Sequence, residues 1–362
     1  MPDKRQTSTM PALINTFDSR HLGLSVAVCL YVFSTNLVLA QQPSTSSDEQ
    51  LSEATGVADE ARALEISREL AARESAIENM QSELGIYDAA LIEAYADFAN
   101  FYRQLEDYAS AISLYSEALQ IARINTGLYS EQQFPIIEAL IDNNGKLEEW
   151  RAVDDLQQLN YHISSRVFAV SDSQYLIAAD DFGDWKLRVI RENLLDQSGR
   201  GLLNTAEDLS DFYERIIDSA ELHSDIKPES LLVMIYGKSQ ADLTLARSTA
   251  AMPYTAFEGT VSRYVNQTRC QTVTNSRGQV VRQCYTVQVE NPRYRQSQRD
   301  AKQMFLSRYT RQISNSIARL RLIKDTSAEL SNGERQRLEI QIAELQTESE
   351  QLLRAARRMT LF

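Results

Sequence analysis

The sequence predicts a mostly α-helical fold, and three observations lead to that prediction. Only 12 Gly and 7 Pro occur among 362 residues, too few to supply the turns of a many-stranded β-sandwich or barrel. Long stretches rich in Ala, Leu, Glu, Gln and Arg favour helices. Apolar residues make up 43% of the chain and charged residues 24%, as in ordinary globular proteins, which excludes disorder throughout.

The first forty residues have the three-part pattern of a secretory signal peptide. Basic residues precede an apolar run from Leu22 to Ala40, and this run ends in Val38-Leu39-Ala40, with small side chains at the two positions that define a cleavage site. We therefore expect cleavage near Ala40 and an exported protein, either periplasmic or secreted. Because an apolar helix of about 20 residues can cross a bilayer, an uncleaved inner-membrane anchor formed by residues 22–40 is the alternative. Residues 41–58 are rich in Ser, Gln and Glu and predict a disordered linker.

Amphipathic helices are expected throughout residues 59–250. The most informative stretch is 92–123, where two helical patterns meet at the turn 104–107. Large side chains alternate with alanine on the faces that must touch, as close antiparallel packing of two helices requires. The packing positions of this pair are Tyr95, Phe98, Ala99, Tyr102, Tyr108, Ala111, Tyr115 and Ala118.

This helix pair resembles the tetratricopeptide repeat (TPR) in its large–small pair, its aromatic positions and its two packing alanines. A second copy lies 42 residues further on, with Leu140, Trp150 and Val153 at the matching positions, and the first helix returns at Phe182-Gly183. This period exceeds the 34 residues usual for the family and matches its longer-helix variety. The resemblance implies a TPR-like α-solenoid of antiparallel helix pairs over residues 59–250.

The resemblance also implies a groove for a protein partner. In the family, ligand-facing residues lie on the first helix of each pair, two positions after its large residue. The matching residues, with neighbours one helical turn away on the same face, are Asn100, Arg103, Glu138, Asp142, Lys146, Asp180 and Asp184. Because most of these side chains are acidic, we expect the groove to prefer basic or neutral partner segments.

Residues 260–290 predict a disulfide-bonded β-hairpin. Thr and Val are abundant there, and Ser276-Arg277-Gly278 suits a three-residue loop with Gly at the left-handed position. That loop would place residue 275 opposite 279, and hence Cys270 opposite Cys284. Directly opposed strand positions bring β-carbons within about 5 Å, close enough for a disulfide.

Residues 293–362 predict a basic helical hairpin with helices at 296–331 and 334–359, broken at Asn332-Gly333. Their facing apolar stripes predict an antiparallel coiled coil. Homo-oligomerisation through the same stripes is the alternative. Nine basic residues and one acidic residue lie between Arg293 and Lys324, whereas residues 41–290 hold 20 basic and 40 acidic residues. Residues 293–324 therefore form a solvated face, or they contact anionic lipid as a peripheral membrane segment or the protein's own acidic helices.

No catalytic or cofactor motif occurs. The sequence has no nucleophile elbow, HExxH helix, phosphate-binding loop or dinucleotide fingerprint, and three His and three Cys are too few for a zinc cluster. We expect no metal, no cofactor and no nucleic-acid partner. The expected function is a non-catalytic exported protein–protein interaction module, a scaffold, adapter or envelope assembly factor. The alternatives are a self-associating structural coiled-coil or membrane-surface protein and, third, an enzyme that uses dispersed carboxylates.

Overall fold

The computed structural model describes residues 48–359, with side chains over 60–354. The chain divides into two units, Met1–Glu65 and Ile66–Phe362, and the contacts below belong to the second. The predicted signal peptide, its anchor alternative at residues 22–40 and the first part of the predicted linker lie outside the described residues. Helix α1 spans Asp48–Leu84, so it begins within the predicted linker and before the expected start at residue 59. The Ser- and Glu-rich residues of that stretch lack an apolar stripe, and for that reason the sequence pattern did not mark them as helical.

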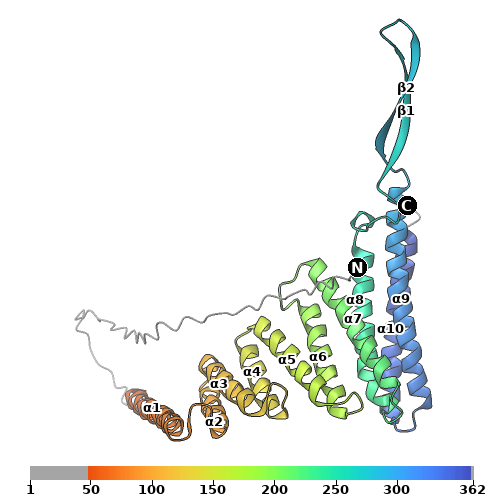
Figure 1. The fold of residues 1–362 in the computed structure, drawn as a ribbon. Coiled ribbons are helices and arrows are strands. Elements are labelled where there is room, and N and C mark those ends of the chain that lie inside the picture. The colour runs from red at the N-terminus through yellow and green to blue at the C-terminus, as the bar shows by residue number, and fades with distance from the viewer. Residues whose placement is uncertain (1–47, 360–362) are drawn as a thin grey trace, which may run out of the picture. The chain divides into compact units, whose positions relative to one another are not determined.

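The prediction of a mostly helical chain with one β-hairpin is confirmed (Figure 1). After α1 the helices are α2 (Ala90–Gln104), α3 (Tyr108–Thr126), α4 (Phe134–Lys146), α5 (Trp150–Val167), α6 (Ser173–Glu192), α7 (Gly199–Glu221), α8 (Leu232–Ala251), α9 (Tyr294–Thr326) and α10 (Asn332–Met359). Strands β1 (Tyr264–Thr274) and β2 (Val280–Glu290) lie between α8 and α9. From α2 to α9 each helix packs against the helix that neighbours it in the sequence, and α6 also contacts α8.

The turn between α2 and α3 is repeated between α4 and α5. In both turns a glutamate holds a left-handed backbone conformation, with φ of 60° at Glu106 and 58° at Glu148, 42 positions apart. Asp107 then begins α3 by accepting a hydrogen bond from the backbone N–H of Ser110 at 3.1 Å. Because a side chain in this conformation costs about 1–2 kcal/mol, packing of the two helices must hold these turns in place. The turn is not repeated a third time at residue 190, because α6 extends to Glu192.

Side chains of the predicted packing positions lie in three adjoining apolar clusters, except that of Tyr108, which belongs to none of them and lines a cleft. Phe98 packs with Ile77 of α1, whereas Leu140 lies in a cluster between α2 and α5. Trp150 packs beside Val153 and Trp185, whose ring centroid is 6.3 Å from that of Trp150. The second of these clusters also holds Ala99, Ala111, Tyr115 and Ala118. Neighbouring clusters share flanking residues. The first two share Ile92, Tyr95, Tyr102 and Leu114, and the last two share Ile141. The apolar core is therefore serial, and each pair of helices covers the next.

The C-terminal helices belong to the largest apolar cluster rather than forming an arm of their own. The apolar stripe of α9, which includes Leu306, Ile313 and Leu320, is buried against both α8 and α10. Basic residues of α9 also contact the preceding helices, and Arg319 lies 2.8 Å from a carboxylate oxygen of Asp218 on α7. The predicted two-helix packing is thus only part of the arrangement, because α8 occupies a large share of the same stripe.

The turn between α9 and α10 differs from the expectation. Helix α9 ends at Thr326, and Asn332, predicted to break the helix, is the first residue of α10. Ser331 and Glu334 form a reciprocal capping pair, in which the Ser331 N–H donates to the Glu334 carboxylate at 2.8 Å and the Glu334 N–H donates to the Ser331 hydroxyl at 3.3 Å. This pair starts α10 one residue after Ser331, so Asn332 and Gly333 lie inside its first turn.

The hairpin has the predicted register. Cys270 lies opposite Cys284 and forms a disulfide with it, and Gly278 in the loop has a φ of 72°. Pairing runs without interruption from Tyr264 opposite Glu290 to Thr274 opposite Val280.

Candidate functional site

A row of clefts runs along the first helix of each pair, α2, α4, α6 and α8. The cleft between α2 and α4 is lined by Arg103, Tyr108, Asp142, Asn143 and Lys146. The next, between α4 and α6, is lined by Glu138, Ile141, Asp142, Gln157, Asn160, Asp181, Asp184, Trp185 and Arg188. A third, between α6 and α8, begins at Asp184 and Arg188 and reaches Arg247. Adjacent clefts share lining residues, Asp142 for the first two and Asp184 and Arg188 for the last two, so the three form one continuous surface.

Five of the seven groove residues expected from the sequence line these clefts, namely Arg103, Glu138, Asp142, Lys146 and Asp184. The other two are placed differently. Asn100 accepts a hydrogen bond from the Tyr115 hydroxyl at 2.8 Å, which ties its side chain to the α2–α3 pair. Asp180 is half-buried in α6, and one of its carboxylate oxygens is buried without a hydrogen-bond partner among the described residues.

The middle cleft is acidic. Four carboxylates line it, those of Glu138, Asp142, Asp181 and Asp184, against one cation, Arg188. Sequence reasoning missed Asp181, because the family pattern selects positions one turn apart and Asp181 lies between two of them. It also missed Gln157 and Asn160, which come from α5, the second helix of the pair. These two residues line the cleft because α5 lies between α4 and α6, and the sequence pattern does not show that placement.

Burial raises the pKa of three aspartates of α6, and like charge adds to the rise at two of them. Desolvation is the largest cause at Asp180, followed by the charges of Asp184 and Asp181, and together they raise its pKa to about 6. Burial also raises the pKa of Asp181 and Asp184, although Arg191 opposes the shift at Asp184. The negative charge of Asp184 thus makes Asp180 and Asp181 hold their protons more tightly, whereas burial is what raises the pKa of Asp184 itself. A cation brought to this cleft would relieve that repulsion.

Below the same carboxylates lies Tyr213 of α7, which is fully buried. Its hydroxyl has no hydrogen-bond partner among the described residues. Burial is the main cause that raises its pKa, and the charges of Asp184 and Asp180 add to it. The tyrosine therefore stays neutral, and its ring fills the space between Gly183 of α6 and Gly237 of α8.

In each of the outer two clefts the lining cations outnumber the lining carboxylates. Between α6 and α8 the lining includes Arg188, Arg191 and Arg247, but Arg188 lies 3.1 Å and Arg191 3.0 Å from carboxylate oxygens of Glu192, and Arg247 pairs with Glu348 of α10. Between α2 and α4, Arg103 and Lys146 accompany Asp142. Asn143 in that cleft is 1% exposed and donates to the Ala139 carbonyl, while its own carbonyl oxygen has no partner among the described residues.

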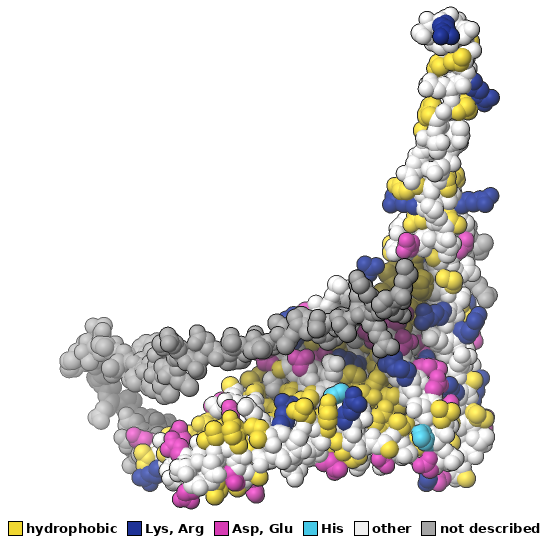
Figure 2. All heavy atoms as spheres, viewed as in Figure 1, with side chains coloured by type: hydrophobic (Ala, Val, Ile, Leu, Met, Phe, Trp, Pro, Cys, Tyr) yellow, Lys and Arg dark blue, Asp and Glu magenta, His cyan; other side chains and the backbone are white. Residues whose placement is uncertain are grey.

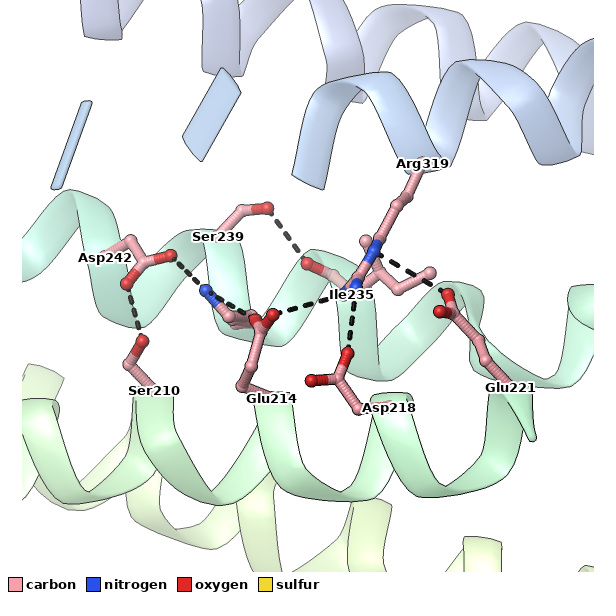
Figure 3. Close-up of polar contacts among 9 residues, drawn as sticks. Ser210, Glu214, Asp218, Glu221, Ile235, Ser239, Asp242 and Arg319 are labelled. Atoms are coloured by element: carbon pink, nitrogen blue, oxygen red, sulfur yellow. Dashed lines mark hydrogen bonds and ion pairs between the residues drawn. The ribbon is translucent and has the colours of Figure 1, made fainter. Parts of the chain in front are cut away.

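A buried ionic cluster joins α7, α8 and α9 away from these clefts (Figure 3). The Lys238 ammonium, 2% exposed, lies 2.8 Å from Asp242, which is fully buried, and 3.1 Å from Glu214. Asp242 also accepts a hydrogen bond from the Ser210 hydroxyl at 2.6 Å. Burial raises the pKa of Asp242 while Lys238 opposes that rise. Each charge in the cluster has a partner, and no cleft described above reaches it. The cluster therefore has a structural role, in which it links α7 to α8.

Over the described residues no group of His, Cys, Asp and Glu is arranged to hold a metal ion. Nor does any helix within residues 48–359 combine the length and apolarity needed to cross a membrane. The clefts can therefore offer charge, hydrogen-bond acceptors and an extended surface to a ligand. No protein-family model matches this sequence, and a search of curated proteins finds no relative of it.

Proposed function

We propose that this protein is a non-catalytic, exported interaction module that holds an extended, basic polypeptide segment along α2, α4, α6 and α8. One observation carries the proposal, the continuous row of clefts whose centre holds four carboxylates against one cation. Stacked helix pairs of the TPR type present their first helices to extended ligands, and the serial core described above supports that arrangement here. A scaffold, adapter or assembly factor of the cell envelope would use such a surface.

Two further features support a polypeptide as the ligand. Asn143 and Asn160 each have a side-chain carbonyl oxygen that is buried without a partner among the described residues, and both residues line clefts. An unpaired buried acceptor costs about 1–3 kcal/mol, so a side-chain rotation that turned either oxygen toward a backbone N–H of a bound segment would be favourable. Lys or Arg side chains of the same segment would neutralise Asp142 of α4 and Asp184 of α6, which line the same cleft.

Export is supported by the Cys270–Cys284 disulfide, because disulfides persist in oxidising compartments. The alternative of self-association through the C-terminal helices is less well supported, since α8 and α10 already cover the apolar stripe of α9. Pairing through that stripe would have to displace one of them.

The experiment that tests the proposal is charge reversal in the middle cleft. The chain with Asp142→Lys and Asp184→Lys is titrated with a labelled, extended Lys/Arg-rich peptide and with an acidic peptide of the same length. We expect the wild type to bind the basic peptide and the variant to lose at least tenfold in affinity, because two attractive contacts become repulsive. The matched control reverses Asp155 and Asp208, which are exposed on α5 and α7 and line none of these clefts. Equal loss in the control would mean that only net charge matters and would overturn the proposal.

A further inference from the structure

The β1–β2 ribbon has two unpaired edges. Its two strands pair only with each other, and no third strand joins them among the described residues. Most of its side chains are exposed, and the apolar ones among them give it a partly hydrophobic surface (Figure 2). A two-stranded ribbon is marginally stable alone in water, and exposed edges are usually protected by lysine, proline or a bulge. Strand β2 has no lysine and no proline, and its register has no bulge.

The hydrogen bonds at both ends of the ribbon determine which backbone groups face the free edge. The Asn291 N–H donates to the Arg263 carbonyl at 2.8 Å, and the Asn275 N–H donates to the Gln279 carbonyl at 2.9 Å. Hydrogen-bonded pairs alternate with non-bonded pairs in an antiparallel ladder, and both of these pairs have odd numbers. The odd-numbered residues of β2 therefore bond to β1, and the N–H and C=O groups of its even-numbered residues point outward.

The side chains of β2 are complementary to a second copy of the same strand. Arg282 and Glu290 are its only charged residues. When two β2 strands run antiparallel about a two-fold axis at Thr286, Arg282 of each copy lies opposite Glu290 of the other. The same register places Tyr285 against Val287 in two equivalent pairs. It also brings even-numbered residues opposite even-numbered residues, so the outward backbone groups meet.

Other two-fold registers along β2 lack this match. An axis at Tyr285 places Arg282 opposite Gln288, and an axis at Cys284 places it opposite Thr286. Strand β1 offers no alternative, since its only charged residue, Arg269, has no acidic residue in the strand to oppose it. We propose that β2 is a dimerisation edge, and that two copies of this chain join through residues 282–290 into a four-stranded antiparallel sheet.

Charge exchange tests the proposed register in the full chain. The mass in solution is measured over a range of concentrations for the wild type, Arg282→Glu, Glu290→Arg and the double variant that carries both changes. We expect the wild type to dimerise and each single variant to dimerise about tenfold more weakly, because two attractive cross-strand pairs per dimer become repulsive. The double variant restores the pairs in exchanged positions and should return to the wild-type dissociation constant. Arg269→Glu, on the strand away from this edge, is the matched control and should change nothing.

A second variant tests the backbone pairing independently of charge. Thr286→Pro removes an outward N–H at the two-fold axis, and the β1–β2 ladder does not use that N–H, so the ribbon stays closed while the dimer is lost. The proposal is overturned if the wild type is a monomer at every concentration, if single charge reversals leave dimerisation unchanged, or if the double variant associates no better than the single ones. A dimer that survives Thr286→Pro would also overturn it.

Discussion

The hydroxyl oxygen of Tyr213 lies 2.1 Å from the position that a β-carbon on Gly183 would occupy, and 2.6 Å from the same position at Gly237. Tyr213 comes from α7, whereas the two glycines belong to α6 and α8. The tyrosine therefore fills the space between α6 and α8, the two helices that line the third cleft. Helices usually avoid glycine at interior positions. Here the two glycines lack the β-carbons that would collide with the Tyr213 ring, so the ring can approach both helix backbones.

Gly183→Ala is expected to destabilise the protein. Alanine is the better helix former, but its methyl group would collide with a fully buried aromatic ring that has no free space to enter, at a cost of about 1–3 kcal/mol. Gly145→Ala is the control, because a β-carbon there has its nearest neighbour, Trp150, at 4.0 Å. The control should gain roughly 0.5–1 kcal/mol from helix propensity. Denaturant midpoints compare the two, and a stable Gly183→Ala protein would contradict the packing described.

Lys238→Ala should be among the most destabilising single changes. Removing the ammonium leaves Asp242 charged and buried, and the loss of one partner from a buried pair costs about 3–5 kcal/mol. Lys227→Ala is the matched control, because Lys227 pairs with Glu329 at 2.8 Å while both side chains remain mostly exposed, at 66% and 58%. Such a surface pair contributes about 0–1 kcal/mol. Urea unfolding measures the free energy of unfolding of both variants, and Lys238→Ala should lose clearly more of it than Lys227→Ala. Similar losses would mean that the cluster around Lys238 is accessible to water.

Replacing both cysteines, Cys270→Ser with Cys284→Ser, should loosen the ribbon and leave the helices intact. The disulfide closes a short loop and contributes about 3 kcal/mol in the chain-entropy model. The ribbon buries few side chains against the helices, so this contribution is local. Amide hydrogen exchange measures the protection of the ribbon and of the helices separately. Amides of β1 and β2 should lose protection, while those of α8, a core helix, should not change, and equal loss in α8 would show that the ribbon supports the core.

Asp180 should make stability depend on pH. Its pKa in the folded protein is raised to about 6, above the ordinary value of an aspartate, because burial and the charges of Asp184 and Asp181 oppose its ionisation. The folded state therefore holds this proton more tightly than the unfolded state, and stability falls as pH rises from about 4 to about 6. Asp180→Asn removes that effect, so the variant should gain stability relative to wild type at pH 7 and gain little at pH 4. Thermal unfolding at the two pH values checks the difference.

The same carboxylate gives a prediction for the proposed ligand. Asp180 does not line the cleft, but its charge lies close to those of Asp181 and Asp184, which do. A basic peptide should therefore bind most tightly when Asp180 is ionised, so its affinity should increase as pH rises through about 6, and binding near that pH should release a proton. Calorimetry in buffers of different ionisation enthalpy measures the proton count directly. Asp180→Asn should flatten the pH profile without abolishing binding. An unchanged profile in that variant would show that the groove senses pH through other groups.

Local patterns predicted several features of this fold correctly. The three-residue loop at 276–278 sets the ribbon register, and with it the position of Cys270 opposite Cys284, because alternation along a strand follows from backbone geometry alone. The 42-residue spacing likewise placed Asp142 and Asp184 on equivalent helix faces, where they line a shared cleft. Errors came where local signals conflicted. Asn332-Gly333 resembles a helix break, but the adjacent Ser331–Glu334 pair starts a helix across it.

The sequence by itself therefore determined the mostly helical class, the hairpin and the disulfide, since each depends on neighbouring residues and on the periodicity of the backbone. Only the tertiary structure decided that α8 and α10 share the apolar stripe of α9, that Lys238 is buried beside Asp242, and that Tyr213 fills the space left by Gly183 and Gly237. Each of these relationships depends on side chains or helices that are distant from one another in the sequence. They arise because side chains from different helices must fill one common volume, and no local pattern records which partner will occupy it.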